Sequence, residues 1–211
     1  MNQYLFVDFE FTMPEGKKRQ QPCRKNGNNR FFAEIIEVGI VSVIGGQIYD
    51  TFSSYVRPEH FPVLSERCKT FLGISQDAVD DGISFSQLVE TFDAYIQLAP
   101  TIVVTWGDGD MIVLRRNCYR ANLPFPNPFR TLDLADEYRR FFGDRNLTSL
   151  RNAIRAYGQN GTGQQHKALD DALTTYEVFK RFEKDKRYLQ PPKKTTIADR
   201  FDFAAILERF A

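Results

Sequence analysis

The sequence predicts an α/β domain in which helices flank a central mixed β-sheet. Three observations predict this fold: an apolar run near the N-terminus, two further runs that meet at a glycine pair, and a later alternation of strand-like with helix-like segments. Such alternation is typical of layered α/β domains. A chain of 211 residues fits one domain, with room for a short terminal appendage.

Strands are expected where apolar and β-branched residues form short runs bounded by turn residues. The first run is apolar throughout, and the next two are joined by a tight Gly45-Gly46 turn. The predicted strands are Tyr4–Val7, Ile35–Ile44, Gln47–Val56 and Thr101–Trp106.

Helices are expected where apolar residues recur every three or four positions. The predicted helices are Phe85–Leu98, Met111–Ala121, Leu132–Phe142, Leu147–Tyr157 and Ala168–Lys184. Prolines or glycines without an apolar period predict loops at Pro14–Arg30, Pro124–Pro128 and Gly158–Gly163.

The C-terminal end is expected to be an appendage to the main domain. Pro191–Lys194 has the composition of a linker, and Phe201–Phe210 predicts a short amphipathic helix. We therefore expect one domain over residues 1–188 and a linker with a short helix over residues 189–211.

Composition narrows the functional classes. A net charge of +1 gives no overall field that would attract nucleic acid or an anionic membrane, so any basic binding surface must be local. Three widely spaced cysteines predict neither a disulfide framework nor a zinc site, which fits a reducing cytoplasm. Neither a signal peptide nor a membrane-spanning segment is predicted, so we expect a cytoplasmic protein without membrane contact.

The most informative motif is Asp8-Phe9-Glu10, directly after the first apolar run. A buried strand rarely keeps acids unless they are paired, protonated or bound to a cation. Strand side chains alternate between faces, so Asp8 and Glu10 project on the same side and repel each other. A divalent metal would remove that penalty, and the motif therefore predicts a metal site at the end of a strand.

Later segments offer partners for these two acids. Asp110 follows the predicted strand Thr101–Trp106, at the strand end where ligand sites of α/β sheets commonly lie. Asp171 falls in the first turn of the last long helix, and His166 precedes it by five residues. An i,i+5 pair is about 140° apart on a continuous helix, so both point to one site only if His166 lies outside the helix.

Four carboxylates and a histidine suit two-metal hydrolysis of a phosphodiester. Two cations roughly 3.5–4 Å apart can stabilise the attacking and the leaving oxygen. Mg²⁺ and Mn²⁺ prefer carboxylate and water oxygens as ligands. A histidine with a near-neutral pKa can accept the proton of the attacking water.

At this point the chain resembles a known family. The motifs that carry the resemblance span residues 3 to 185, and their order along the chain is that of the DEDDh 3′–5′ exonucleases, in particular the ERI-1/histone-mRNA exonuclease branch. They are Asp8-Phe9-Glu10, Glu34-Ile35-Ile36-Glu37, Phe71-Leu72-Gly73-Ile74, Asp110-Met111 and His166-Lys167-Ala168-Leu169-Asp170-Asp171-Ala172. The resemblance implies an RNase H-like fold, hydrolysis of single-stranded RNA or DNA from its 3′ end, and two Mg²⁺ or Mn²⁺ ions.

The family's residues carry over position by position. The metal-binding acids fall on Asp8, Glu10, Asp110 and Asp171, and the general base falls on His166. Asp108 competes with Asp110, which we prefer because Met111 follows it, and Asp170 competes with Asp171. The resemblance also implies that the 3′ nucleotide is contacted by Phe11, Thr12, Met13 and Met111.

Several roles stay open at the level of sequence. Phe71, Leu72 and Ile74 either form a wall against the 3′-terminal base or belong to the core. Glu34 either supports the site from behind or is an ordinary edge-strand acid, and Trp106 is expected to pack the end of its strand.

Substrate and partner are also open. The basic residues between Lys17 and Arg30 either hold a phosphate backbone or are simply solvated. RNA is preferred over DNA on the resemblance alone, with nucleoside monophosphate as the product. One alternative is a DNA-specific proofreading or repair exonuclease. Another, which only the resemblance implies, is a regulatory protein that inhibits a sporulation kinase pathway by contact with a protein partner.

Overall fold

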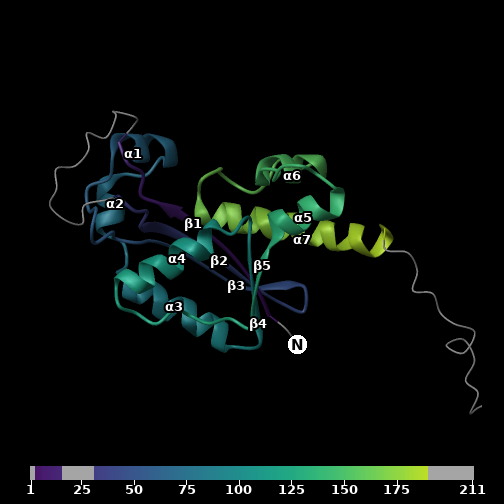
Figure 1. Ribbon diagram of the computed structural model, residues 1–211, viewed down its shortest axis with the longest axis horizontal. Coiled ribbons are helices and arrows are strands. Elements are labelled where there is room, and N and C mark those ends of the chain that lie inside the picture. Colours follow the sequence, from purple (N-terminus) through teal and green to yellow (C-terminus); the bar gives the residue numbers. More distant parts are fainter. Residues whose placement is uncertain (1–2, 16–30, 190–211) are drawn as a thin grey trace, which may run out of the picture. The chain divides into compact units, whose positions relative to one another are not determined.

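A computed structural model describes residues 3–15 and 31–189 (Figure 1). Five strands form one mixed sheet in the order β3-β2-β1-β4-β5. β1 pairs antiparallel with β2 and parallel with β4, while β2–β3 is antiparallel and β4–β5 is parallel. The strands are β1 (Gln3–Phe11), β2 (Ile35–Ile44), β3 (Gln47–Tyr55), β4 (Thr101–Thr105) and β5 (Arg130–Asp133). The predicted mixed α/β sheet is confirmed.

The observed helices agree with the predicted ones where the helical repeat of apolar residues extends over several turns. They are α1 (Glu66–Leu72), α2 (Gln76–Asp80), α3 (Phe85–Gln97), α4 (Gly109–Arg120), α5 (Leu134–Phe142), α6 (Leu150–Ala156) and α7 (Ala168–Leu189). None of the helices in the described ranges has the length and apolar composition that crossing a bilayer requires.

Three differences from the predicted elements have simple physical reasons. α1 and α2 were not expected because each is too short to show a helical period. The predicted helix from Leu132 begins at Leu134, since Asp133 caps it by accepting the N–H of Asp136, and the preceding residues pair with β4 as strand β5. α7 continues past Lys184 to Leu189.

The chain divides into two compact units, Met1–Phe179 and Lys180–Ala211. The first unit holds the whole sheet and every predicted site residue. The predicted domain boundary at residue 188 stays a prediction. Most of the basic loop Pro14–Arg30 and the predicted C-terminal linker and helix lie outside the described residues.

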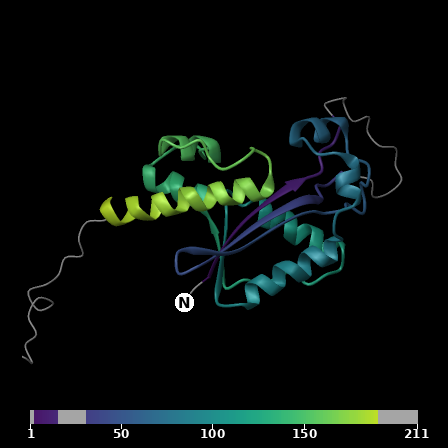
Figure 2. The same cartoon turned by 180° about the vertical axis from the view of Figure 1, so that it is seen from behind.

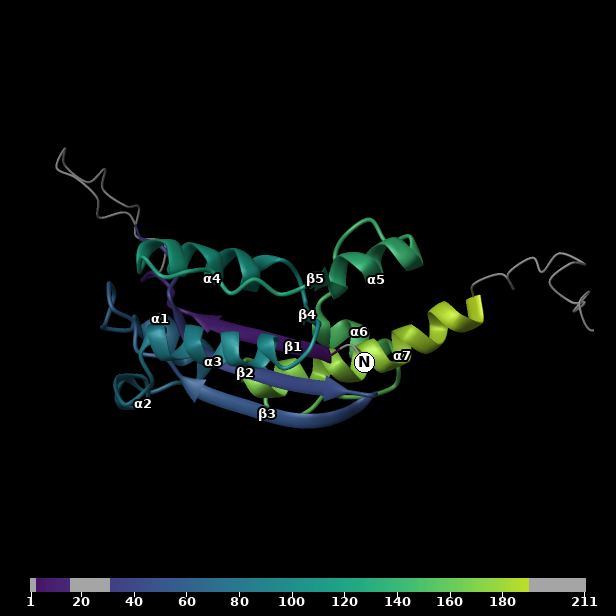
Figure 3. The ribbon, with the colours of Figure 1, turned by 90° about the horizontal axis from the view of Figure 1, so that it is seen from below.

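Within the first unit, helices cover both faces of the sheet. α3 and α4 pack against one face, where Leu5, Val7 and Phe9 of β1 join the main core (Figure 3). The start of α7 lies on the opposite face (Figure 2), where the rings of Phe6 and Tyr176 have centroids 5.0 Å apart.

Side chains of β1 alternate between the two faces of the sheet, and this alternation decides where its acids point. Tyr4 and Phe6 contact Phe179 of α7 with their rings, and the next two residues on the same face are Asp8 and Glu10. Because α7 runs antiparallel to β1, these carboxylates meet its N-terminal turn rather than its aromatic residues.

A glycine in β2 allows the N-terminal end of α7 to lie directly against the sheet. Gly39 pairs with Asp8, and a Cβ on Gly39 would lie 2.2 Å from the main-chain carbon of Ala168, the first residue of α7. Any other side chain here would push the helix off the sheet. The glycine therefore sets the distance between the acids of β1 and those of α7.

Candidate active site

The first two carboxylates lie on β1 as the strand period predicts. Glu10 is largely buried, with 11% of its side chain exposed. Its cross-strand partner on β2 is a second buried glutamate, Glu37. The site thus begins as a concentration of negative charge at one end of the sheet.

Asp110 adds a third carboxylate from the first turn of α4. β4 ends at Thr105, so the edge of β1 beyond Phe6 has no strand partner on that side. Oδ1 of Asp110 accepts the N–H of Phe9 at 3.1 Å and replaces the missing strand carbonyl. Asp108, by contrast, is exposed and makes no capping bond at the start of α4, so the geometry favours Asp110 for the third position.

The loop before α7 brings in the last two predicted residues. His166 lies outside the helix in the left-handed region, with φ 63°, and its N–H donates to Oδ2 of Asp171 at 3.0 Å. Asp170 points away and accepts the N–H of Gln164 at 2.8 Å. Asp170 therefore fastens the loop, while Asp171 faces the acids of β1.

These residues converge on one point. Nδ1 of His166 lies 3.9 Å from Oε1 of Glu10, and one ligand atom each from Glu10, His166 and Asp171 lie within 4.8 Å of one another. The condition that His166 lie outside the helix is thus met. Side chains from β1, α4, α7 and the loop before α7 form one cluster.

Burial and mutual repulsion leave these acids poorly stabilised as anions. Burial raises the pKa of Glu10 to about 8, and the charges of Asp171, Glu37 and Asp110 add to the rise. Burial and then the charge of Asp110 raise the pKa of Asp8 well above its usual range. Burial also raises the pKa of Asp110 to about 7, although the N–H of Phe9 opposes the shift.

One cation of the chain partly offsets this charge. Nζ of Lys167 lies 3.6 Å from Oε2 of Glu37 and donates to the hydroxyl of Tyr55 at 2.9 Å. Its charge lowers the pKa values of Glu37 and Glu10, but burial still keeps both raised. Lys167 and Tyr55 were missed at the level of sequence, because only the register of β2 with β1 brings Glu37 beside Glu10.

An open cavity of about 380 Å³ lies beside the carboxylates. Its size is that of a small-ligand site. Lining side chains include Asp8, Arg151, Asn160, Gln165, His166 and Asp171. Arg151 donates to Gln165 of the loop before α7 at 3.1 Å, so a positive side chain borders the acid cluster.

The four predicted nucleotide contacts have different surroundings. The hydroxyl of Thr12 accepts the N–H of Glu34 at 2.9 Å and is buried. Phe11 and Met111 are half-buried against the main core, and Met13 packs against the small core under α1. Their contact with a nucleotide stays a prediction.

The Phe71–Ile74 motif divides between the two roles left open. Leu72 and Ile74 are buried in the small core beside α1. Phe71 is exposed, and its ring centroid lies 4.5 Å from that of His166. Only Phe71 is therefore free to meet a base at the site. Trp106 packs on Tyr138 and donates to the carbonyl of Thr148, as expected for a residue that closes a strand end.

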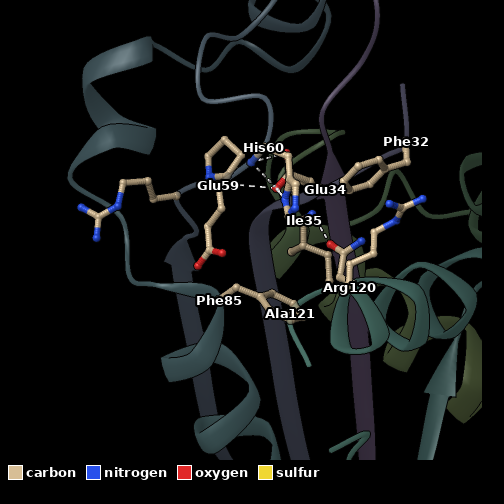
Figure 4. Close-up of a pocket in the computed structure, with 11 residues that line it drawn as sticks. Phe32, Glu34, Ile35, Glu59, His60, Phe85, Arg120 and Ala121 are labelled. Carbon is tan, nitrogen blue, oxygen red and sulfur yellow. Dashed lines mark hydrogen bonds and ion pairs between the residues drawn. The ribbon is translucent and has the colours of Figure 1, made fainter. Parts of the chain in front are cut away.

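Glu34 has neither of the roles considered for it. Its carboxylate accepts the N–H groups of Glu59, His60 and Phe61 and lies 3.2 Å from Nδ1 of His60 (Figure 4). The side chain thus holds the loop that follows β3 against the segment before β2.

The donor set fits divalent cations. Buried carboxylates that repel one another are expensive without a counter-charge, and oxygen ligands suit Mg²⁺ and Mn²⁺. Oε2 of Glu37 is buried without a hydrogen-bond partner, which also indicates that the cluster accepts more positive charge than Lys167 supplies.

Comparison with known proteins finds similar sequences over almost the whole chain. The exonuclease family profile RNase_T matches residues 5–179. The probable 3′-5′ exonuclease KapD of Bacillus subtilis (strain 168) is 48% identical over 208 residues, which cover 99% of this chain and 98% of that protein. Human 3′-5′ exoribonuclease 1 is 29% identical over 191 residues, which cover 85% of this chain and 52% of the human protein.

Solved structures show the same fold. The nuclease domain of 3′hExo, a DEDDh family member bound to rAMP, has a TM-score of 0.75 at 28% identity, over 92% of this chain and 97% of that one. Exonuclease I of E. coli in complex with an oligonucleotide has a TM-score of 0.67 at 14% identity, over 90% of this chain and 42% of that one, which is a likeness of fold alone.

Proposed function

Because this chain belongs to the RNase T family of exonucleases, of the DEDDh type, we propose that it removes nucleoside 5′-monophosphates from the 3′ end of single-stranded RNA with two Mg²⁺ or Mn²⁺ ions. The observation that carries the proposal is the convergence of Glu10 and Asp171 on the half-buried loop histidine His166, beside an open cavity.

Each residue has a role that its position supports. Asp8, Glu10, Asp110 and Asp171 would hold the cations, since the charges of the other three acids raise the pKa of Asp8 at this end of the sheet. Bound there, the cations would supply positive charge that stabilises the transferring phosphoryl group and lowers the pKa of the attacking water.

His166 would accept the proton of the attacking water. Its Nδ1 faces Glu10, and its backbone N–H is held by Asp171, so the ring stays near the acids while 35% of the side chain is exposed. A base at the rim of the site can pass the proton to solvent.

Preference for RNA rests on the relatives. The similar human protein is named an exoribonuclease, and 3′hExo was crystallised with the ribonucleotide rAMP. The exposed ring of Phe71, beside His166, would stack on the terminal base of a single strand.

The test is hydrolysis of 5′-labelled RNA and DNA oligomers of one sequence, mixed in competition, with Mn²⁺ or with EDTA. We expect shortening from the 3′ end that EDTA abolishes, with RNA consumed faster. Intact oligomers under all conditions would refute the proposal, and faster loss of DNA would favour a DNA-specific proofreading or repair role.

His166→Asn provides a matched variant, because asparagine tolerates the left-handed backbone that His166 adopts. We expect a fall in kcat of about 10²–10⁴, the usual contribution of a general base, with the fold retained.

The regulatory alternative stays a prediction with its own discriminator. A Glu10→Ala variant that no longer cleaves RNA but still inhibits sporulation would favour action by contact. A variant that loses both effects would tie the phenotype to hydrolysis.

A further inference from the structure

The solvent face of α4 carries a cluster of cationic and aromatic side chains. Leu114, Asn117 and Cys118 point inward and are buried. The opposite side of the helix presents Arg115, Arg116, Tyr119 and Arg120, all exposed. We call these four residues, with Phe31, Phe32 and Val113 beside them, the α4 groove.

Aromatic rings hold two of the arginines in place. The guanidinium of Arg120 lies 3.7 Å from the ring centroid of Phe32, and the two side chains lie next to each other in Figure 4. The guanidinium of Arg115 lies 4.3 Å from the ring centroid of Phe125. Stacking of this kind fixes an arginine while leaving edge N–H groups to bind an anion.

Two carboxylates lie near one end of the groove, since Glu34 and Glu59 line a neighbouring hollow together with Arg120. Over residues 3–15 and 31–189, no carboxylate forms an ion pair with Arg115, Arg116 or Arg120. The chain as a whole has a net charge of only +1, so this local excess of positive charge is a property of the surface and not of the composition.

Its shape suits an extended ligand. Phe31, Phe32, Val113 and the α4 side chains line an open hollow of about 830 Å³. Tyr119 stands beside it with 87% of its surface exposed, and no aromatic ring within residues 3–15 and 31–189 stacks on it.

The groove lies within reach of the proposed active site. Both involve α4, which carries the proposed metal ligand Asp110 in its first turn and ends at Arg120. Ten residues of helix at 1.5 Å each separate them by about 15 Å. A separation of this size along the helix is within the length of a few nucleotides of single-stranded RNA.

We infer that the α4 groove binds the single-stranded RNA segment upstream of the 3′ end. The arginines contact the phosphates, and Tyr119 stacks on a base. This inference rests on the proposed function for its ligand, and it adds a second contact region that sets how strongly longer substrates bind. Positively charged grooves with exposed aromatic rings are the usual means of binding single strands without reading their sequence.

The binding test uses the full chain with Ca²⁺ in place of Mn²⁺ and a 5′-fluorescein oligouridylate of twelve nucleotides, followed by fluorescence anisotropy. The variant Arg116→Gln/Tyr119→Ser changes two exposed side chains and is compared with Arg187→Gln/Tyr188→Ser, which changes the same residue types at exposed positions of α7. An unchanged thermal midpoint verifies that each variant is folded.

We expect the groove variant to raise Kd about tenfold and to lower the slope of log Kd against log salt by about 0.7, as loss of one phosphate contact on a single strand predicts. The α7 variant should match the wild type. A Kd and slope equal to those of the wild type in the groove variant would overturn the inference. So would an equal loss of binding to duplex RNA of the same length, because stacking on Tyr119 requires unpaired bases.

A kinetic ratio separates this inference from the proposed function. With Mn²⁺, kcat/KM for the twelve-nucleotide RNA is divided by kcat/KM for the p-nitrophenyl ester of thymidine 5′-monophosphate, which reaches only the active site. The groove variant should lower this ratio about tenfold. If the wild type cleaves both substrates and the ratio does not change, the groove inference fails. If it cleaves neither, the proposed function fails, and the anisotropy result decides the groove by itself.

Discussion

Replacing Glu10 by glutamine is expected to stabilise the metal-free protein at neutral pH, although it removes a proposed metal ligand. The reason is the raised pKa. The carboxyl group of Glu10 has a usual pKa of 4.5 and a pKa of about 8 in the folded chain. At a pH between these two pKa values the carboxyl group takes up a proton when the chain folds. The free energy of unfolding therefore falls as the pH rises from 4.5 to about 8.

The size of the effect follows from the pKa values. At pH 7 the solution lies about 2.5 units above the unfolded pKa, and at roughly 1.4 kcal/mol for each unit the folded state loses about 3 kcal/mol. At pH 5 the same reasoning gives about 1 kcal/mol. Only 11% of the side chain is exposed, so solvent screening reduces these values little. Glutamine keeps the shape without the titrating group and removes the cost.

The assay is urea unfolding in EDTA at pH 5, 6, 7 and 8, followed by the fluorescence of Trp106, the single tryptophan of the chain. We expect Glu10→Gln to raise the free energy of unfolding by about 3 kcal/mol at pH 7 and by about 1 kcal/mol at pH 5. Glu90→Gln, at an exposed position of α3, is the matched control and should change it by less than about 0.5 kcal/mol at every pH.

Two results would contradict this reasoning. A Glu10→Gln variant that is less stable than the wild type at pH 7 in EDTA would show that the carboxylate is favourable without metal. A stabilisation independent of pH would show that it does not arise from the proton. In Mn²⁺ at about 1,000 times its Kd the sign should reverse, because ligand at that level stabilises the wild type by about 4 kcal/mol.

Further predictions concern the residues that place the cluster. Gly39→Ala should destabilise the fold by about 1–3 kcal/mol in chemical denaturation, because its Cβ would overlap the main chain of α7, whereas Gly109→Ala, with open space around it, should not. Asp110→Ala and Asp110→Asn should both lose nuclease activity, but only the alanine variant leaves the N–H of Phe9 unpaired, at about 1–3 kcal/mol in thermal unfolding. Lys167→Met should destabilise by about 2 kcal/mol and raise the metal concentration needed for activity, and an added Glu37→Gln, which removes the unpaired charge, should recover most of the stability. Equal stability of the two variants in any of these pairs, Gly39→Ala with Gly109→Ala, Asp110→Ala with Asp110→Asn, or Lys167→Met with its Glu37→Gln double variant, would refute the corresponding contact.

The sequence was sufficient where a short period or a motif decides the structure. The two-residue period of β1 places Asp8 and Glu10 on one face, and that prediction holds because the other face is the main core. The long helices α3, α4 and α7 were found within a few residues of their ends, except that α7 runs further.

The features that the sequence did not predict depend on contacts between distant segments of the chain. β5 is four residues of mixed polarity, and only pairing with β4 makes it a strand. Glu34 holds a loop more than twenty residues away, so its role cannot be read from its neighbours. Gly39 had a local signal, a glycine inside an apolar strand, which usually marks a close approach of another backbone.

The energetics of the cluster connect its fold to its proposed chemistry. Repulsion among the acids raises the free energy of the metal-free state, and three local features hold them together against it: Gly39 admits α7, Phe9 fixes Asp110, and the loop backbone at His166 fixes Asp171. The surrounding core must supply the stability that this arrangement costs, as strained functional sites generally require. Since Lys167 offsets only part of the charge, the remaining negative potential is available to bind cations. The same repulsion that destabilises the metal-free protein therefore increases the affinity for the metal that the reaction needs.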